Sequence, residues 1–286
     1  MTSLDLFSPA VREWFTRAFG DPTPPQEAGW PAIARGENTL ISASTGSGKT
    51  LAAFLWAIDR LLRDCPVGDP SGRLRTDGRS VDEPRKTRVV YVSPLKALGY
   101  DIERNLRVPL ASIGGANEIR IGIRTGDTPQ KERQALVRKP PDILITTPES
   151  LYLMLTSQAR QTLTEVDSVI LDEIHAVAGS KRGTHMALTL ERLEHLVEHP
   201  IQRIGLSATQ RPIEQIARFM GGISQPEGRA RAVTIVEVPN AKSLDLEVVV
   251  PVADLRDPES EPDAAPMDFV AERGDTASRR SIWPSI

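Results

Sequence analysis

The chain has 286 residues, of which 40% are hydrophobic and 26% are charged, so it holds enough apolar sequence for a substantial core. Its net charge of −3 excludes a global basic field. That balance argues against a protein that coats nucleic acid, but not against an enzyme that holds a strand through local loops. The single cysteine, Cys65, excludes an intramolecular disulfide. Because no secretory leader or membrane-spanning run is visible, we expect a cytoplasmic protein without a membrane partner.

The N-terminal region is predicted to be helical. Apolar residues recur at helical spacing between residues 4 and 19, with Ser8 and Pro9 as cap and first turn. The prolines that follow are expected to hold the backbone extended up to Gln26, where a second short helical stretch begins. A side-chain amide can pair with N6 and N7 of adenine. Gln26 is therefore a candidate adenine reader, and an ordinary exposed glutamine is the alternative that the residues leave open.

A glycine-rich turn lies between a β-favouring run at residues 39–42 and an amphipathic helix pattern at 51–62. This context predicts a phosphate-binding loop, in which backbone N–H groups and the helix N-terminus surround an anion. Lys49 can reach the β- and γ-phosphates of a bound nucleotide, and the Thr50 hydroxyl can bind Mg²⁺. A dinucleotide fold is disfavoured because Leu51 stands where that fingerprint needs a third glycine. The predicted loop residues are Ala43, which replaces the usual first glycine, Ser44, Thr45, Gly46, Ser47, Gly48, Lys49 and Thr50.

The chain then alternates between strand and helix patterns. Residues 65–86 are rich in Gly, Pro, Arg and Asp and are predicted to form a surface insertion. The apolar runs that follow predict an α/β fold, with a mainly parallel sheet covered by helices on both faces. In such sheets, ligands bind beyond the carboxyl ends of the strands. Each run ends in a polar corner; the segments are 87–94, 119–128, 142–155, 166–177 and 201–209.

Two adjacent carboxylates follow one of these runs. Asp172 is predicted to hold the Mg²⁺ that Thr50 also binds, and Glu173 to orient or deprotonate the attacking water. Adjacent like charges are costly unless a cation balances them, which favours a metal site over two solvated acids. At the next strand end, Ser207 and Thr209 place two hydroxyls where they can bridge a γ-phosphate site to another surface.

The motifs taken together resemble the first RecA-like domain of a superfamily 2 DEAD/DEAH-type helicase. The sequences of these motifs are most similar to those of the large helicase-related (Lhr) family of bacterial DNA-repair helicases, and the resemblance covers nearly the whole chain. The motifs that carry the resemblance are, in order, PPQ, ASTGSGKT, SPLKAL, RTGDT, TTPESL, DEIH and GLSAT, with RRSIWPSI at the end.

The resemblance implies a role for each motif. It implies that Gln26 reads adenine and that the loop from Ala43 to Thr50 holds ATP. It also implies that Lys49, Asp172, Glu173 and His175 serve hydrolysis, and that His175 with Ser207 and Thr209 couples the nucleotide to the nucleic acid. Single-stranded DNA is the expected partner, with RNA or an RNA–DNA hybrid as alternatives. The expected nucleic-acid track consists of Pro94, Lys96, Thr125, Gly126, Thr147, Pro148 and Glu149.

The same resemblance predicts three regions. Residues 1–35 are expected to carry the N-terminal helix and adenine reader, 36–238 the RecA-like ATP-binding domain, and 239–286 an extension toward a second RecA-like lobe encoded downstream. Since that lobe would supply the arginines of the ATP site, we expect the chain to be truncated and unable to unwind alone. A nucleic-acid-binding or regulatory module with vestigial ATPase activity is the alternative. A small-molecule kinase is disfavoured by TTPESL and SPLKAL.

Overall fold

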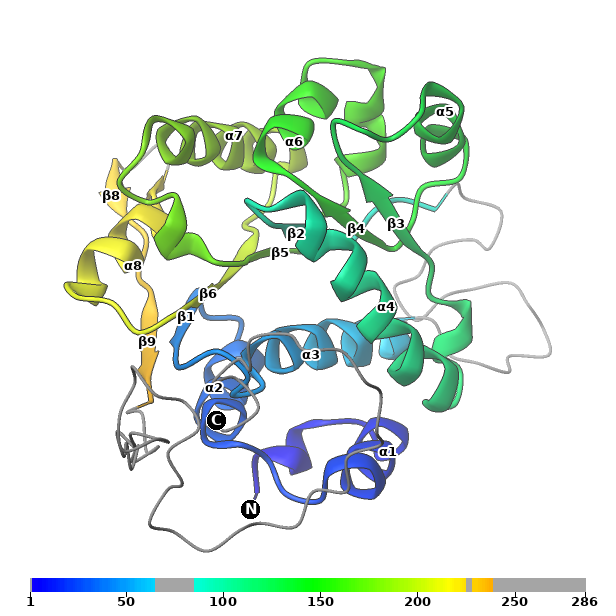
Figure 1. Cartoon of the computed structure of the whole chain (residues 1–286), viewed down its shortest axis with the longest axis vertical. Helices are drawn as coiled ribbons and strands as arrows, with labels where there is room; N and C mark the ends of the chain where they lie inside the picture. The colour runs from blue at the N-terminus through cyan, green and yellow to red at the C-terminus, as the bar shows by residue number, and fades with distance from the viewer. Residues whose placement is uncertain (1, 65–84, 225–227, 239–286) are drawn as a thin grey trace, which may run out of the picture. The chain divides into compact units, whose positions relative to one another are not determined.

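The computed structural model describes residues 2–64, 85–224 and 228–238 of the chain (Figure 1). Contacts between Cα atoms group residues 1–240 into one compact unit, and a second unit, 241–286, lies outside the described residues. Most of the predicted insertion at 65–86, Cys65 and the predicted extension from 239 onward also lie outside them. The domain limits at residues 35 and 238 stay predictions.

A seven-stranded sheet in the order β3-β4-β2-β5-β6-β1-β9 forms the centre of the fold. All its neighbouring strands pair in parallel. The strands are short apolar runs, most of them buried along their whole length, as expected for a parallel sheet covered on both faces. Their bounds are β1 Thr39–Ser42, β2 Val89–Val92, β3 Ile121–Arg124, β4 Ile143–Thr146, β5 Ser168–Leu171, β6 Gln202–Ser207 and β9 Thr234–Glu237.

Helices cover both faces of this sheet (Figure 1), which confirms the predicted layers. One apolar cluster joins the sheet to the first four helices, and a second joins it to the last three. The helices are α1 Pro9–Phe19, α2 Pro24–Ala34, α3 Lys49–Asp64, α4 Lys96–Ser112, α5 Gln130–Arg138, α6 Pro148–Leu155, α7 Lys181–Val197 and α8 Ile213–Gly221. Short elements are η1 Ser3–Leu6, η2 Ala116–Glu118, η3 Gln158–Leu163, η4 Ile174–Ala176 and the antiparallel pair β7 Ile223–Ser224 and β8 Arg229–Ala230.

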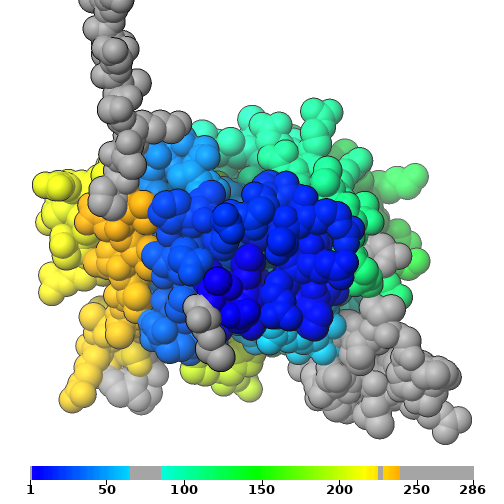
Figure 2. All heavy atoms as spheres, turned by 90° about the horizontal axis from the view of Figure 1, so that it is seen from below, coloured from blue at the N-terminus to red at the C-terminus, as the bar shows by residue number. Residues whose placement is uncertain are grey.

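The N-terminal segment packs on the helix that follows the glycine-rich turn. Trp30 of α2 donates its indole N–H to the Ala52 carbonyl at 3.0 Å, and its ring meets Phe7 and Phe15 edge-on, with centroids 4.7 and 5.4 Å away. Figure 2 shows these first helices spread over one face of the molecule, beside the residues of β9. The N-terminal segment therefore shares the core of the sheet that carries the site.

The predicted start of the first helix is confirmed, because α1 begins at Pro9 after the cap residue Ser8. The apolar residues before it form the separate short element η1. The predicted start of the next helix was wrong. The second helix begins at Pro24 rather than Gln26, because proline is tolerated in the first turn of a helix. In the described part of the chain, no helix is both long and apolar enough to cross a bilayer.

Candidate nucleotide-binding site

The carboxyl ends of the parallel strands place the predicted motifs along one edge of the sheet. The glycine-rich turn follows β1, the carboxylates follow β5, and Ser207 ends β6. The strand order puts β6 between β1 and β5. A backbone bond from Ala43 N to the Ser207 carbonyl, 3.2 Å long, extends the β1–β6 pairing into the turn. Three motifs that are distant in sequence therefore become neighbours.

The predicted phosphate loop has the backbone that its glycines allow. Gly46 and Gly48 have φ of 73° and 87°, a region where a side chain would be strained. The φ angle of Ala43 is not positive, so alanine is accommodated at the position where the strict pattern has glycine. Lys49 begins α3, and its Nζ donates to the carbonyls of Ala43 and Ser44 at 2.6 and 2.7 Å. Thr50 follows it in the first turn of the same helix.

Gln26 is buried and hydrogen-bonded to the phosphate loop. Its Oε1 accepts from the Thr23 backbone N–H at 2.9 Å, and its Nε2 donates to the Gly48 carbonyl at 3.3 Å. The Thr23 hydroxyl donates to the Ser47 carbonyl at 2.8 Å, which adds a second link from the start of α2 to the same turn. Gln26 therefore lies where an adenine reader is expected, with its amide engaged inside the chain. Adenine reading stays a prediction.

The two carboxylates lie close to Lys49. Asp172 is 9% exposed; its Oδ1 accepts from the Glu173 backbone N–H at 2.9 Å, and its Oδ2 accepts from the Tyr91 hydroxyl. Burial raises the pKa of Tyr91, and the charge of Asp172 raises it further. Burial lowers the pKa of Lys49, while the charges of Glu173 and Asp172 act in the opposite direction. The site therefore combines one buried cation with two carboxylates whose charges act on it.

His175 joins the end of β5 to the end of β6. Its Nε2 lies 3.3 Å from Glu173 Oε2, and its Nδ1 accepts from the Ala208 backbone N–H at 3.2 Å. Glu173 adopts a left-handed conformation, φ 46° and ψ 38°, which is uncommon for a residue other than glycine. The Ser207 hydroxyl donates to the Ala208 carbonyl at 2.8 Å, whereas Thr209 is exposed just beyond it. The predicted hydrolytic and coupling motifs are thus in direct contact.

The residues predicted to line the nucleic-acid track fall into two groups. Lys96, Gly126 and Glu149 are exposed at the strand ends, and the Lys96 ammonium pairs with Asp127 at 2.8 Å. The other four are buried, where their side chains shape the turns rather than the surface. These buried residues are Pro94, Thr125, Thr147 and Pro148.

Sequence reasoning missed Arg182, which joins two of the predicted track motifs. Its guanidinium binds both carboxylate oxygens of Glu149, at 2.5 and 3.0 Å, and donates to the Pro94 carbonyl at 2.6 Å. The hydrogen bond with Arg182 lowers the pKa of Glu149. Arg182 lies in the first turn of α7 after the cap residue Ser180, and nothing in that local pattern indicates a contact with either motif.

The donors at this edge fit a magnesium ion. The described residues contain no group of three or more His, Cys, Asp or Glu side chains that could hold a metal by themselves. Mg²⁺ instead prefers oxygen ligands and is commonly bound by one or two protein groups together with phosphates and water. The Asp172 carboxylate and the Thr50 hydroxyl supply that kind of donor set.

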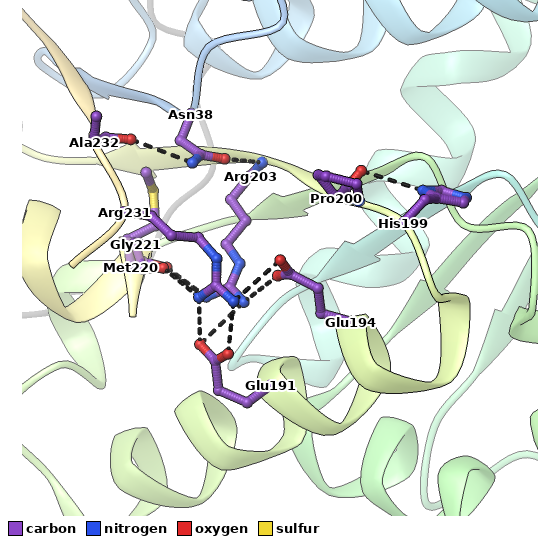
Figure 3. A network of polar contacts seen from close by, with 10 residues as sticks. All are labelled: Asn38, Glu191, Glu194, His199, Pro200, Arg203, Met220, Gly221, Arg231 and Ala232. Atoms are coloured by element: carbon purple, nitrogen blue, oxygen red, sulfur yellow. Dashed lines mark hydrogen bonds and ion pairs between the residues drawn. The ribbon is translucent and has the colours of Figure 1, made fainter. Parts of the chain in front are cut away.

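A cavity of about 840 Å³ lies at the opposite edge of the sheet, away from this site. It is lined by residues at the amino ends of β1, β5 and β6, including Asn38, Asp167 and Gln202. Beside it, Arg203 and Arg231 share the carboxylates of Glu191 and Glu194 (Figure 3). Because these charges neutralise one another, the network holds α7 against β6 and the segment before β9.

Similarity to known proteins agrees with the geometry. A family model described as DEAD/DEAH box helicase matches residues 23–216. The Lhr helicase/probable uracil glycosylase of Mycolicibacterium smegmatis is 51% identical over 99% of this chain, and the Lhr helicase/uracil glycosylase of Escherichia coli K12 is 50% identical over 99%. The chain spans only 17% and 18% of these two relatives.

A solved structure gives the same result. The structure of Mycobacterium smegmatis helicase Lhr bound to ssDNA and AMP-PNP matches 100% of this chain and 32% of that chain, with a TM-score of 0.74 and 49% identity. The fold of the described residues is therefore that of a RecA-like helicase domain, as the sequence predicts.

Proposed function

The chain belongs to the DEAD/DEAH box helicase family, and we propose that it binds Mg-ATP and single-stranded DNA as the first motor domain of an Lhr-like, ATP-dependent DNA-repair helicase in the cytoplasm. The observation that carries this proposal is the direct contact of the two strand-end motifs, through Glu173, His175 and Ala208, beside Lys49. The Lhr relative whose structure holds ssDNA and AMP-PNP supports the choice of ligands.

Each residue of the site has a distinct task in this proposal. The Lys49 ammonium leaves the carbonyls of Ala43 and Ser44 to bind the β- and γ-phosphates, while backbone N–H groups of the loop surround them. Mg²⁺ held by Asp172 and Thr50 would neutralise charge on the phosphate oxygens. Glu173 orients the attacking water and accepts its proton.

His175 connects this chemistry to the nucleic acid. A change at Glu173 on nucleotide binding would reach Ala208 through the imidazole, and from there the Ser207–Thr209 segment. Lys96 and Gly126 are exposed at the same edge, where an ammonium and a backbone amide can bind phosphate oxygens without reading sequence. Nucleotide and strand would then bind to adjacent parts of one surface.

We further propose that the 286 residues do not unwind DNA by themselves. The described residues build a single RecA-like sheet, and the arginine that completes such an ATP site is worth about 10³–10⁵ in hydrolysis rate. A second RecA-like lobe is therefore the expected partner. The chain alone should bind ATP and a strand, hydrolyse ATP slowly and leave duplexes intact.

Binding of a fluorescent ATP analogue, with and without Mg²⁺, tests the proposal. Lys49→Ala should abolish binding, whereas the control Lys131→Ala, at an exposed position in α5, should not. ATP-analogue binding by Lys49→Ala that equals wild type would overturn the nucleotide site.

Fluorescence anisotropy with labelled ssDNA, ssRNA and an RNA–DNA hybrid measures which nucleic acid the chain binds. Equal affinities of Gln26→Ala for ATP and GTP would support adenine reading by Gln26. Efficient unwinding by these 286 residues would contradict the need for a second lobe.

A further inference from the structure

A buried tyrosine hydroxyl contacts the carboxylate that is proposed to hold the metal. Tyr91 lies in the middle of β2 and is 0% exposed. It pairs with Ile170 of β5, so Asp172 comes two residues later on the same face of the neighbouring strand. The Asp172 backbone N–H also donates to the Val92 carbonyl at 3.0 Å, which continues the ladder to this point. The phenol therefore reaches along the sheet to the Asp172 side chain.

Both oxygens of Asp172 are restrained by this arrangement. The Tyr91 hydroxyl donates to Oδ2, and the Glu173 backbone N–H donates to Oδ1 at 2.9 Å. The phenol ring is itself held by Phe54 of α3, with ring centroids 5.0 Å apart and planes inclined by 30°. Phe54 belongs to the helix that Lys49 and Thr50 begin. The ring of Tyr91 therefore lies between the phosphate-loop helix and the metal-binding carboxylate.

Packing alone does not explain the buried hydroxyl of Tyr91. The rest of β2 is valine, and a phenylalanine would fill the same apolar space without burying a polar atom. A buried hydroxyl is costly unless it finds a hydrogen-bond partner, and the partner of Tyr91 is Asp172. The hydroxyl of Tyr91 therefore orients the Asp172 carboxylate, which an apolar side chain at this position could not do.

We propose that Tyr91 is a positioning residue, which holds the Asp172 carboxylate in the orientation that binds Mg²⁺ with the nucleotide. The proposal rests on the Mg-ATP site proposed above. Groups that hydrogen-bond to metal ligands fix the ligand's orientation, and their removal typically lowers metal affinity or activity by about 10–100-fold. Loss of the Tyr91 hydroxyl should therefore weaken Mg²⁺ binding while leaving the phosphate loop intact.

A magnesium titration of nucleotide binding tests the inference. Binding of a fluorescent ATP analogue is measured in EDTA and then at increasing Mg²⁺, for wild type, Tyr91→Phe and the control Tyr100→Phe, which alters an exposed tyrosine of α4. In Tyr91→Phe we expect unchanged binding in EDTA, which also shows that the variant folds. The Mg²⁺ midpoint should rise by about 10–100-fold, and Tyr100→Phe should match wild type.

A double-mutant cycle identifies the route of the effect. In an Asp172→Asn background, Tyr91→Phe should cause no further shift in the Mg²⁺ midpoint, because the carboxylate through which it acts is gone. An unchanged midpoint in Tyr91→Phe, or an equal shift with and without Asp172, would overturn the inference. The proposed function fails separately, if wild type binds no nucleotide or if Lys49→Ala binds it normally.

Discussion

The backbone N–H of Ala208 donates to Nδ1 of His175 across 3.2 Å. Because Nδ1 accepts this bond, the proton of a neutral His175 lies on Nε2, which faces Glu173 Oε2 at 3.3 Å. One imidazole ring therefore connects a carboxylate at the end of β5 to the backbone at the end of β6. A single side chain thus links the proposed hydrolytic group to the segment that carries Ser207 and Thr209.

We expect His175→Ala to uncouple ATP and DNA binding. The variant loses both contacts of the ring, so a strand should no longer alter the affinity for nucleotide. Coupling factors in such systems are typically about 5–150-fold, and this factor should fall toward 1. The measurement is the affinity for an ATP analogue with and without ssDNA.

The control is His199→Ala, which alters an exposed histidine after α7. It should keep the wild-type coupling factor. Full coupling in His175→Ala would show that the connection between the two strand ends runs elsewhere.

Arg182 should neutralise Glu149 on the surface that is proposed to bind the strand. Arg182→Ala leaves that exposed carboxylate unpaired, which should lower ssDNA affinity by about 3–10-fold through charge repulsion. Adding Glu149→Gln should restore most of the loss, because the repelling charge is gone. Anisotropy titrations of the two single variants and the double variant at fixed salt measure the cycle. Equal losses in Arg182→Ala with and without Glu149→Gln would contradict this role.

Gly183 should be intolerant of any side chain. A Cβ at this position would lie 2.0 Å from the Val177 carbonyl oxygen, since the start of α7 packs closely on the turn after η4. Gly183→Ala should lower the free energy of unfolding by about 1–3 kcal/mol, as overpacked positions do. Gly179→Ala is the matched control in the same turn: its Cβ meets nothing within 4 Å. Urea unfolding compares the two, and equal stability would show that the turn relaxes.

The network at the opposite edge should stabilise the fold in a pH-dependent way. Burial alone would raise the pKa of Glu191, but its hydrogen bond with Arg231 and the charges of Arg203 and Arg231 outweigh burial and lower it. A carboxyl with a lowered folded-state pKa contributes stability above its unfolded pKa, and that contribution is lost as the pH falls through the folded value. For Glu191 the loss should therefore occur below the ordinary value of 4.5.

Glu191→Gln should lower the free energy of unfolding by about 1–3 kcal/mol at neutral pH, because two arginines lose a charged acceptor. Its stability should also fall less than that of wild type as the pH drops below about 4.5. Glu13→Gln, which removes an exposed pair with Arg17, should change stability by less than about 0.5 kcal/mol. If the free energy of unfolding fell equally for wild type and Glu191→Gln as the pH drops below about 4.5, Glu191 would not be the source of the pH-dependent stability.

Local patterns in the sequence predicted the parts of the site that lie within one motif. The turn from Ala43 to Thr50 needs left-handed backbone at Gly46 and Gly48, which only glycine adopts without strain. The glycines in the sequence therefore indicate the conformation of the turn. The apolar runs likewise predicted a parallel sheet, and with it the edge at which Asp172 and Ser207 lie. The start of α1 at Pro9 was also predicted, whereas α2 begins at Pro24 and not at Gln26, because prolines that suggest an extended chain are also tolerated in the first turn of a helix.

The sequence alone thus determined the fold class, the phosphate loop and the residue types available at each strand end. Only the tertiary structure decided which strand ends are neighbours. It pairs β2 with β5 and β5 with β6, which brings Tyr91 to Asp172 across 81 residues and His175 to Ala208 across 33. Hydrophobic periodicity depends on residues a few positions apart, whereas strand order results from the packing of the whole sheet. For this reason Tyr91 and Arg182, whose roles lie in contacts between elements, were visible only in the structure.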